Sequence, residues 1–318
     1  MKLLLCGFGS IGRRHLRNAQ TLLPAGATWT IVEPERSAWV SEPGVRFAAS
    51  LEEAAGEHDV ALVCSPTALH AAHIAAIADR VGAIFIEKPL AHDRAALEAI
   101  RATLSRRGIP VMVGCNYRFE AGLLEVRRLL VEGAVGRALS VRAEYGQWLP
   151  RWRPQQDYRL GYAARRATGG GIVLDRIHEL DYVLWLAGPV TDVKAFHGKL
   201  STLEIETEDT AEVLLRFASG AIGSVHVDYL QHEYVCALKI IGERGTIEWR
   251  FRPTVVRVVR EDGAAQIAYE DATPDVNAMY VAELRHFFDC VRTGAPPTNG
   301  LDEAATTLET ALAVLEAR

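Results

Sequence analysis

Two segments of the chain carry side chains that could move a proton. Lys88 lies in Glu87-Lys88-Pro89, directly after a short apolar run. Asp175, His178 and Asp181 follow one another at intervals of three, which would bring them together on one face of a helix. Histidine titrates near neutrality and suits the role of general base toward a hydroxyl group. The alternatives are a surface lysine that ends a strand, and a capping aspartate beside a buried histidine.

Metal binding is the other chemistry open to an aspartate and a histidine. No third ligand is evident near Asp175 and His178, and no Cys-x-x-Cys pair suggests zinc. We therefore expect no metal. The five cysteines are scattered along the chain, which argues against a disulfide framework and favours a reducing cytoplasm.

Gly7-Phe8-Gly9-Ser10-Ile11-Gly12 matches the GxGxxG pattern of dinucleotide-binding proteins, between an apolar run and a helical pattern. Gly7 would permit a tight turn, Gly9 would let the backbone approach a pyrophosphate, and Gly12 would let helix and strand pack closely. The helix beginning at Ser10 and Ile11 would present its N-terminus to the phosphates. The alternative is that the three glycines only form a turn.

An acidic residue is expected about 20 positions after such a loop, at the end of the second strand. Glu33 occupies that position, and its carboxylate would accept hydrogen bonds from the ribose hydroxyls of the cofactor. The carboxylate would also repel a 2′-phosphate, which favours NAD over NADP. Arg36 lies close by and could bind a 2′-phosphate, so NADP stays possible.

Aromatic and arginine side chains crowd residues 147–159, just before Gly169-Gly170-Gly171. Trp148, Trp152 and Tyr158 offer stacking faces, and arginines offer paired donors. These side chains suit a polyhydroxylated or acidic small molecule. A surface loop that uses its aromatics only for packing is the alternative.

The first third of the chain alternates apolar runs with helical patterns. We predict strands at 2–6, 29–32, 60–64, 83–86 and 111–113, and helices at 11–23, 51–58, 68–80 and 94–107. Continuous apolar strands separated by helices predict a parallel sheet covered on both faces, the doubly wound Rossmann arrangement.

The pattern changes after about residue 118. Longer stretches of period-two alternation predict strands at 138–147, 190–197, 211–217, 221–229 and 235–241, with Ser219-Gly220 as a hairpin turn and helices at 123–132, 280–291 and 301–317. We thus expect an α/β protein with a Rossmann domain at 1–118 and an α+β domain with an open, mainly antiparallel sheet at 119–318. The final helix is expected to pack back on the Rossmann domain.

The composition excludes several classes of protein. A net charge of −5 over 318 residues lacks the basic excess that nucleic-acid binding requires. The first apolar run is too short for a signal-peptide core or a membrane span, so we expect no membrane association and a cytoplasmic location.

Taken in order, these motifs resemble the glucose–fructose oxidoreductase/inositol dehydrogenase/MocA family over essentially the whole length. The resemblance rests on Gly7–Gly12, Cys64–His70, Glu87-Lys88-Pro89-Leu90, Asn116-Tyr117-Arg118-Phe119 and Gly169–Asp181. It implies NAD or NADP as the cofactor, bound by Gly7, Gly9, Ser10, Ile11, Gly12, Glu33, Ser65, Pro66, His70, Glu87, Lys88 and Asn116. It also implies homodimers or homotetramers formed through the C-terminal sheet.

In that family Lys88 and His178 match the catalytic lysine and histidine, with Asp175 as a third catalytic residue. Two residues separate Asp175 from His178 where many members have three, so Asp181 or Glu179 could share its role. Substrate contacts are expected from Arg118, Trp148, Trp152, Tyr158, Arg165, Asp175 and His178.

The resemblance implies reversible oxidation of a secondary alcohol on a sugar, cyclitol or sugar derivative. Two other functions stay open. One is a regulatory protein that senses the nucleotide without catalysis, and the other is a lyase or hydrolase that oxidises its substrate only transiently. A catalytically silent sensor would not need both Lys88 and His178.

Overall fold

The computed structural model describes residues 1–317, which form two compact units. Unit 1 comprises Met1–Asn116 and Tyr280–Thr306, and unit 2 comprises Tyr117–Met279 and the residues from Thr307 onward. None of the described helices is both long enough and apolar enough to cross a membrane.

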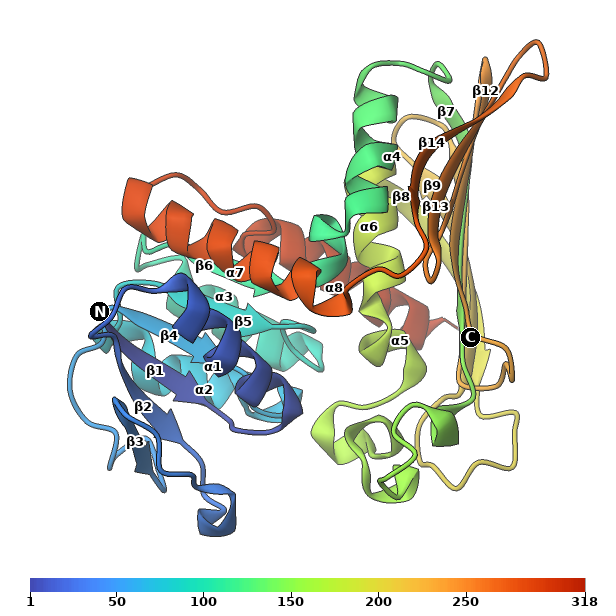
Figure 1. Cartoon of the computed structure of the whole chain (residues 1–318). Helices are drawn as coiled ribbons and strands as arrows, with labels where there is room; N and C mark the ends of the chain where they lie inside the picture. The colour runs from blue at the N-terminus through green and yellow to red at the C-terminus, as the bar shows by residue number, and fades with distance from the viewer. Residues whose placement is uncertain (318) are drawn as a thin grey trace. The chain divides into compact units, whose positions relative to one another are not determined.

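Unit 1 is built on a parallel six-stranded sheet in the order β3-β2-β1-β4-β5-β6 (Figure 1). Its strands are β1 (Lys2–Cys6), β2 (Thr28–Val32), β3 (Val45–Ala48), β4 (Val60–Val63), β5 (Ile84–Glu87) and β6 (Val111–Gly114). Every residue of β4, β5 and β6 is buried, as expected of strands covered on both faces. The predicted Rossmann arrangement is confirmed.

The helices of unit 1 are α1 (Ser10–Leu22), α2 (His70–Ile77), α3 (Arg94–Leu104) and most of α7 (Val276–Thr293), with the start of α8 (Leu301–Glu316). The chain moves one way from β1 to β2 and the other way from β4 to β6. Right-handed crossovers therefore put α1 on one face of the sheet and α2 and α3 on the opposite face. The ring of Phe287 on α7 meets that of Phe85 on β5, with their centroids 5.6 Å apart.

Two details of unit 1 differ from expectation. The predicted helix at 51–58 is wrong, because these residues form turns that include Gly56 at a φ of +115°. The short edge strand β3 was not predicted, since only Ala48 in it is buried.

Unit 2 contains an eight-stranded sheet in the order β14-β13-β12-β11-β7-β10-β9-β8 (Figure 1). Its strands are β7 (Ala138–Gly146), β8 (Val190–Gly198), β9 (Thr210–Phe217), β10 (Ile222–Asp228), β11 (Val235–Gly242), β12 (Gly245–Arg250), β13 (Thr254–Arg260) and β14 (Ala265–Asp271). Only the β7–β10 pair is parallel among these described strands, which confirms the predicted, mainly antiparallel sheet.

Helices lie against one face of this sheet. They are α4 (Ala121–Val131) and α6 (Ile177–Ala187), with the single turn of α5 (Ile172–Asp175) before α6. Short 3-10 helices fill the connections at Asn116–Phe119, Leu149–Arg151, Tyr158–Leu160, Tyr162–Ala164 and Arg166–Thr168. The strands β12 to β14 were not predicted. β12 and β14 carry few buried residues, so their apolar pattern is weak.

Trp249 on β12 is the centre of the packing between sheet and helices. The side chain is fully buried, meets the ring of Tyr182 on α6 at 5.8 Å, and donates from Nε1 to Glu120 Oε2 at 3.0 Å. Burial raises the pKa of Glu120, even though backbone amides and side-chain donors bind its carboxylate.

We predict that Trp249→Ala lowers the free energy of unfolding by about 3–5 kcal/mol, because a large cavity forms and Glu120 loses a donor. Urea denaturation followed by circular dichroism measures this. The neighbouring Arg250 is exposed, and Arg250→Ala serves as the control, with an effect of less than about 0.5 kcal/mol. Equal destabilisation by both variants would contradict the central packing role assigned to Trp249.

Candidate functional site

The glycine loop of unit 1 (Gly7–Gly12) joins β1 to α1, and its backbone is tightly packed at two of its three glycines. A Cβ on Gly12 would lie 2.1 Å from the carbonyl oxygen of Gly7, and a Cβ on Gly7 would lie 2.7 Å from the backbone of Ser65. Gly7 also has a φ of +94°, which favours glycine. Gly9 differs, since nothing lies within 4 Å of its Cβ position. Gly7 and Gly12 thus serve packing, whereas Gly9 borders open space.

The N-terminus of α1 is suited to an anion. Ser10 is the first helical residue, no side chain caps the helix, and the first turn contains no acidic residue. Backbone N–H groups and the helix dipole can therefore act on a phosphate without a competing carboxylate.

Glu33 directly follows β2 and is held by the backbone. Its Oε2 accepts from Phe8 N and its Oε1 from Glu35 N, both at 3.0 Å. This carboxylate therefore links the glycine loop to the end of β2, where an adenosine ribose is expected. The Arg36 guanidinium lies 5.3 Å from the centre of the Trp39 ring nearby.

Ser65, Pro66 and His70 lie just after β4, beside the glycine loop. The buried Ser65 hydroxyl has no hydrogen-bond partner among the described residues, so it can serve a ligand. His70 lies between two carbonyl oxygens, of Ser65 at 3.0 Å and of Leu90 at 3.2 Å, and its burial lowers its pKa. His70 thereby ties this loop to the segment after Lys88.

Glu87, Lys88 and Asn116 lie at the carboxyl ends of the next two strands. Glu87 ends β5, Lys88 is half-buried, and Asn116 is buried shortly after β6. Unit 1 thus gathers all the predicted cofactor residues at one edge of its sheet. The open space at Gly9, the Ser65 hydroxyl and the uncapped α1 together fit a dinucleotide.

In unit 2 the glycine run Gly169-Gly170-Gly171 leads directly into the predicted catalytic segment. Gly169 and Gly171 have φ values of +86° and +114°, and a Cβ on Gly170 would lie 2.2 Å from Tyr162 O. Each position therefore requires glycine. The run delivers the chain into α5, which ends at Asp175.

The helix expected to carry Asp175, His178 and Asp181 on one face is interrupted. Arg176, with a φ of −103° and a ψ of 37°, separates α5 from α6. The half-buried Arg176 guanidinium lies 3.5 Å from the centre of the Tyr145 ring and pairs with Glu179 at 2.5 Å. These contacts stabilise the break, so Asp175 and His178 belong to different helices.

The predicted catalytic side chains have different surroundings. His178 is buried, and its ring lies 5.0 Å from that of Tyr117. Asp175 accepts a hydrogen bond on Oδ2 from the Tyr229 hydroxyl at 3.2 Å. Burial raises the pKa of Tyr229, which keeps that hydroxyl a donor. Tyr229 was not predicted as a site residue, since it lies 54 residues from Asp175.

Arg118 and Asp181 form an ion pair with each other, and neither lines the cavity that adjoins Asp175. Both are buried, and the guanidinium grips the carboxylate through Nε and Nη2, each at 2.9 Å. Thr307 Oγ1 lies 3.4 Å from the same carboxylate. This pair fastens the start of unit 2 to α6, which leaves Asp175 as the carboxylate nearer to solvent.

A cavity of about 80 Å³ adjoins Asp175 in unit 2. Its walls include Trp152, Tyr158 and Tyr162, with Arg153 and Asp157 at the exposed side. Tyr162 was not predicted, although it lies only a few residues before the glycine run. Four residues predicted to contact substrate lie outside this lining. Arg118 and His178 are buried elsewhere in unit 2, the Trp148 ring lies tilted against that of His232 at 4.9 Å, and Arg165 is exposed.

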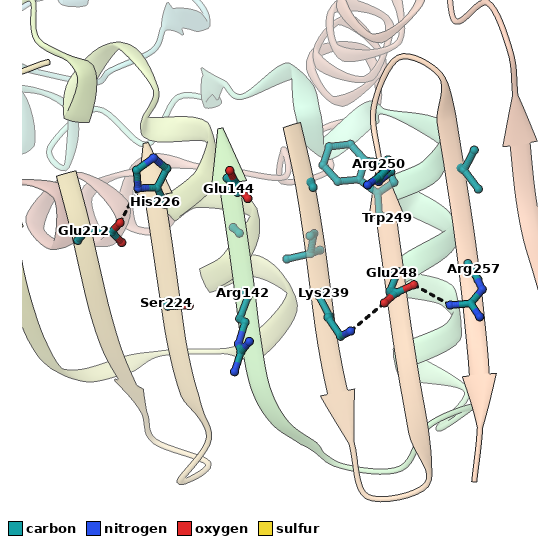
Figure 2. Close-up of a pocket in the computed structure, with 14 residues that line it drawn as sticks. Arg142, Glu144, Glu212, Ser224, His226, Lys239, Glu248, Trp249, Arg250 and Arg257 are labelled. Carbon is teal, nitrogen blue, oxygen red and sulfur yellow. Dashed lines mark hydrogen bonds and ion pairs between the residues drawn. The ribbon is translucent and has the colours of Figure 1, made fainter. Parts of the chain in front are cut away.

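A second hollow, of about 580 Å³, lies on the outward face of the eight-stranded sheet (Figure 2). It contains none of the predicted site residues. Lys239, Glu248 and Arg257 form an ion-paired row across three strands, with contacts of 2.8 and 2.9 Å. The neighbouring His226 donates hydrogen bonds to the carboxylates of Asp228 and Glu212, which raise its pKa to about 9.

One group of the described residues could geometrically hold a cation. His15, Glu87 and Glu283 are buried in unit 1, and one ligand atom of each lies within 4.8 Å of the others. His15 Nε2 and Glu87 Oε1 are already 2.5 Å apart, the separation of a short hydrogen bond.

We predict that Gly9→Ala weakens NADH binding strongly while leaving the melting temperature unchanged, because its methyl group enters space that only a bound pyrophosphate would fill. Gly12→Ala, by contrast, lowers both the NADH affinity and the melting temperature, since its Cβ collides with the Gly7 carbonyl. Fluorescence titration and thermal melting measure the two effects. Parental NADH affinity in Gly9→Ala would contradict the predicted role of this loop.

Comparison with known proteins yields two family matches. Residues 1–115 match the oxidoreductase family with an NAD-binding Rossmann fold, and residues 123–248 match the GFO/IDH/MocA C-terminal domain. Among curated relatives, scyllo-inositol 2-dehydrogenase (NAD(+)) of Bacillus subtilis is 24% identical, over 96% of this chain and 91% of its own. Myo-inositol 2-dehydrogenase of Thermotoga maritima is 28% identical, over 75% and 71%.

Solved structures share the fold over the full length. Levoglucosan dehydrogenase in complex with NADH and levoglucosan superposes with a TM-score of 0.85 at 21% identity, covering 100% of this chain and 96% of the other. An oxidoreductase from Agrobacterium radiobacter in complex with NAD+, L-tartaric acid and magnesium gives the same TM-score, identity and coverage. With both domains matched in order, the chain belongs to the Gfo/Idh/MocA family of NAD-binding oxidoreductases.

Proposed function

We propose that this oxidoreductase is an NAD-dependent dehydrogenase that oxidises a secondary alcohol on a ring-shaped polyol or sugar derivative, and reduces the ketone in reverse. The relatives named above act on inositols and on levoglucosan, which are rings bearing several hydroxyl groups. Their low identity leaves the substrate of this chain to be argued from its own residues.

The cavity beside Asp175 is the observation that carries the proposal. The indole of Trp152 and the rings of Tyr158 and Tyr162 offer apolar surface, and Asp175 offers charged acceptors. A polyol ring has C–H groups that pack on aromatic faces and hydroxyl groups that donate to a carboxylate. Tyr229 fixes one oxygen of Asp175, so the carboxylate would meet the substrate in a defined orientation.

Bound NAD would supply the acceptor of the hydride at its nicotinamide ring. In the proposed mechanism His178 takes the proton of the substrate hydroxyl, since an imidazole can carry it near neutral pH. Lys88, with a positively charged ammonium group, stabilises the developing alkoxide and can exchange a proton with it. His178 is buried, so little water reaches its ring. Asp175 orients the ring hydroxyls.

We predict that Lys88→Met lowers kcat by about 10²–10⁴, far more than it weakens NADH binding, because the alkoxide loses its charged partner and general acid. The assay follows NADH absorbance with scyllo-inositol, myo-inositol and levoglucosan as substrates. Lys2→Met is the matched control in unit 1, since Lys2 is exposed at the start of β1 and should be dispensable.

Each outcome of that assay has a clear meaning. Near-full activity of Lys88→Met would overturn the assigned role of the lysine. Parental protein that binds NADH but turns over no polyol, sugar or ketone would favour the nucleotide sensor. Conversion of substrate with no net change in NADH would favour transient oxidation within a lyase or hydrolase.

We also propose that two copies of the chain associate through the outward face of the eight-stranded sheet. That face exposes the large apolar side chains Phe196, Leu214 and Ile222, which are 81%, 57% and 53% accessible. Leu214 pairs with Lys194 on β8, one position along the outward face from Phe196. An exposed apolar patch beside ion-paired rows is suited to a self-complementary, two-fold interface.

Replacing both Phe196 and Leu214 by Asp should shift the protein to monomers, because buried like charges then face each other across the two-fold axis. Size-exclusion chromatography with light scattering gives the mass. Val131→Asp is the control, since Val131 is 80% accessible but lies on α4, at the opposite face of the sheet. An unchanged mass in the double variant would rule out this interface.

A further inference from the structure

We infer that His15 is a positioning residue for Lys88, acting through the carboxylate of Glu87. The inference rests on the proposed role of Lys88. It adds a side chain that lies on the helix of the glycine loop and that the proposed chemistry does not itself use.

The link runs through both oxygens of one carboxylate. Glu87 Oε1 lies 2.5 Å from Nε2 of His15, and Glu87 Oε2 accepts a hydrogen bond from the backbone N–H of Lys88 at 3.1 Å. Lys88 is the residue after the end of β5, so this N–H lies at the base of its side chain. The Glu87 carboxylate therefore holds α1 and the Lys88 backbone together.

His15 is well placed to keep that carboxylate still. It is fully buried, and its ring meets Phe85 edge-on at 5.1 Å and Tyr280 at 6.1 Å. Phe85 lies on β5 and Tyr280 on α7, so the imidazole is confined between the sheet and a second helix. His15 is also one turn beyond Gly12, whose position is fixed by its contact with Gly7.

Loss of the imidazole would disturb the lysine rather than the cofactor loop. Glu87 is nearly buried, and a buried carboxylate that loses a donor must find another. Rotation of the carboxylate toward another donor would weaken its bond to Lys88 N. A displacement of about 1 Å in a reacting group can lower the rate by about 10²-fold. Gly7 and Gly12 keep their backbone packing, so nucleotide binding is unaffected.

The test compares two replacements of His15 in the full-length chain. His15→Leu removes the donor, and we expect kcat to fall by about 10–10² with unchanged NADH affinity. His15→Gln keeps an N–H donor and should recover most of the activity. His73→Leu, a half-buried histidine on α2, is the control and should leave kcat unchanged.

A merely structural role gives a different result. In that case His15→Leu and His15→Gln both lose melting temperature or NADH affinity, and kcat per NADH-binding site stays at the parental value, which overturns the inference. If His15→Leu does not fold, Glu87→Ala breaks the same link from the other side and should show the same loss of kcat. Where His15→Leu and Glu87→Ala both fold, the double variant should lose no more of kcat than either single variant.

Lys88→Met separates this inference from the proposed function. If Lys88→Met retains activity, the proposed role of the lysine fails and the inference fails with it. If Lys88→Met is inactive but His15→Leu matches the parent, only the inference fails.

Discussion

The contact between Gly12 and the carbonyl of Gly7 is the constraint on which the dinucleotide half of this protein depends. A Cβ added to Gly12 would lie 2.1 Å from the Gly7 carbonyl oxygen, so Gly12 can carry no side chain. The same close approach brings α1 against the end of β1. Two of the other residues predicted to touch the cofactor meet this loop directly. Glu33 is bound by Phe8 N inside the same loop, and the backbone of Ser65 lies against Gly7. The sheet order, with β1 between β2 and β4, makes these neighbours meet.

In unit 2 the corresponding constraint is the break in the helix at Arg176. Arginine side chains are mostly exposed, but that of Arg176 is only 11% accessible and lies against two aromatic rings and the Glu179 carboxylate. Burial alone would lower the pKa of Arg176, but the Glu179 carboxylate holds it above the usual value, so the guanidinium stays charged. The break lets Asp175 turn toward Tyr229 and the cavity while His178 packs on Tyr117.

The sequence predicts features that depend on local chemistry and misses those that depend on distant partners. The glycine loop, the strands of the parallel sheet and the place of Lys88 at a strand end follow from residues adjacent in the chain. The break at Arg176 could not be predicted, because the apolar helical pattern runs through it without a glycine or proline. The pairing of Arg118 with Asp181 joins residues 63 apart, and no spacing rule indicates it. The edge strand β3 was missed because its residues are mostly half-exposed.

The proposed roles divide between rigid elements and a variable connecting segment, which would explain how one fold can serve several substrates. Lys88 and His178 extend from a central strand and a packed helix, whose positions are fixed by cores that tolerate little change. Trp152, Tyr158 and Tyr162 lie instead in a segment of short 3-10 helices after β7, held by local contacts such as the Tyr162 hydroxyl to Gly169 O. Such a segment can change in sequence without disturbing the strands. The groups proposed to carry out the reaction thus lie on the rigid elements, and those proposed to select the substrate lie on the variable ones.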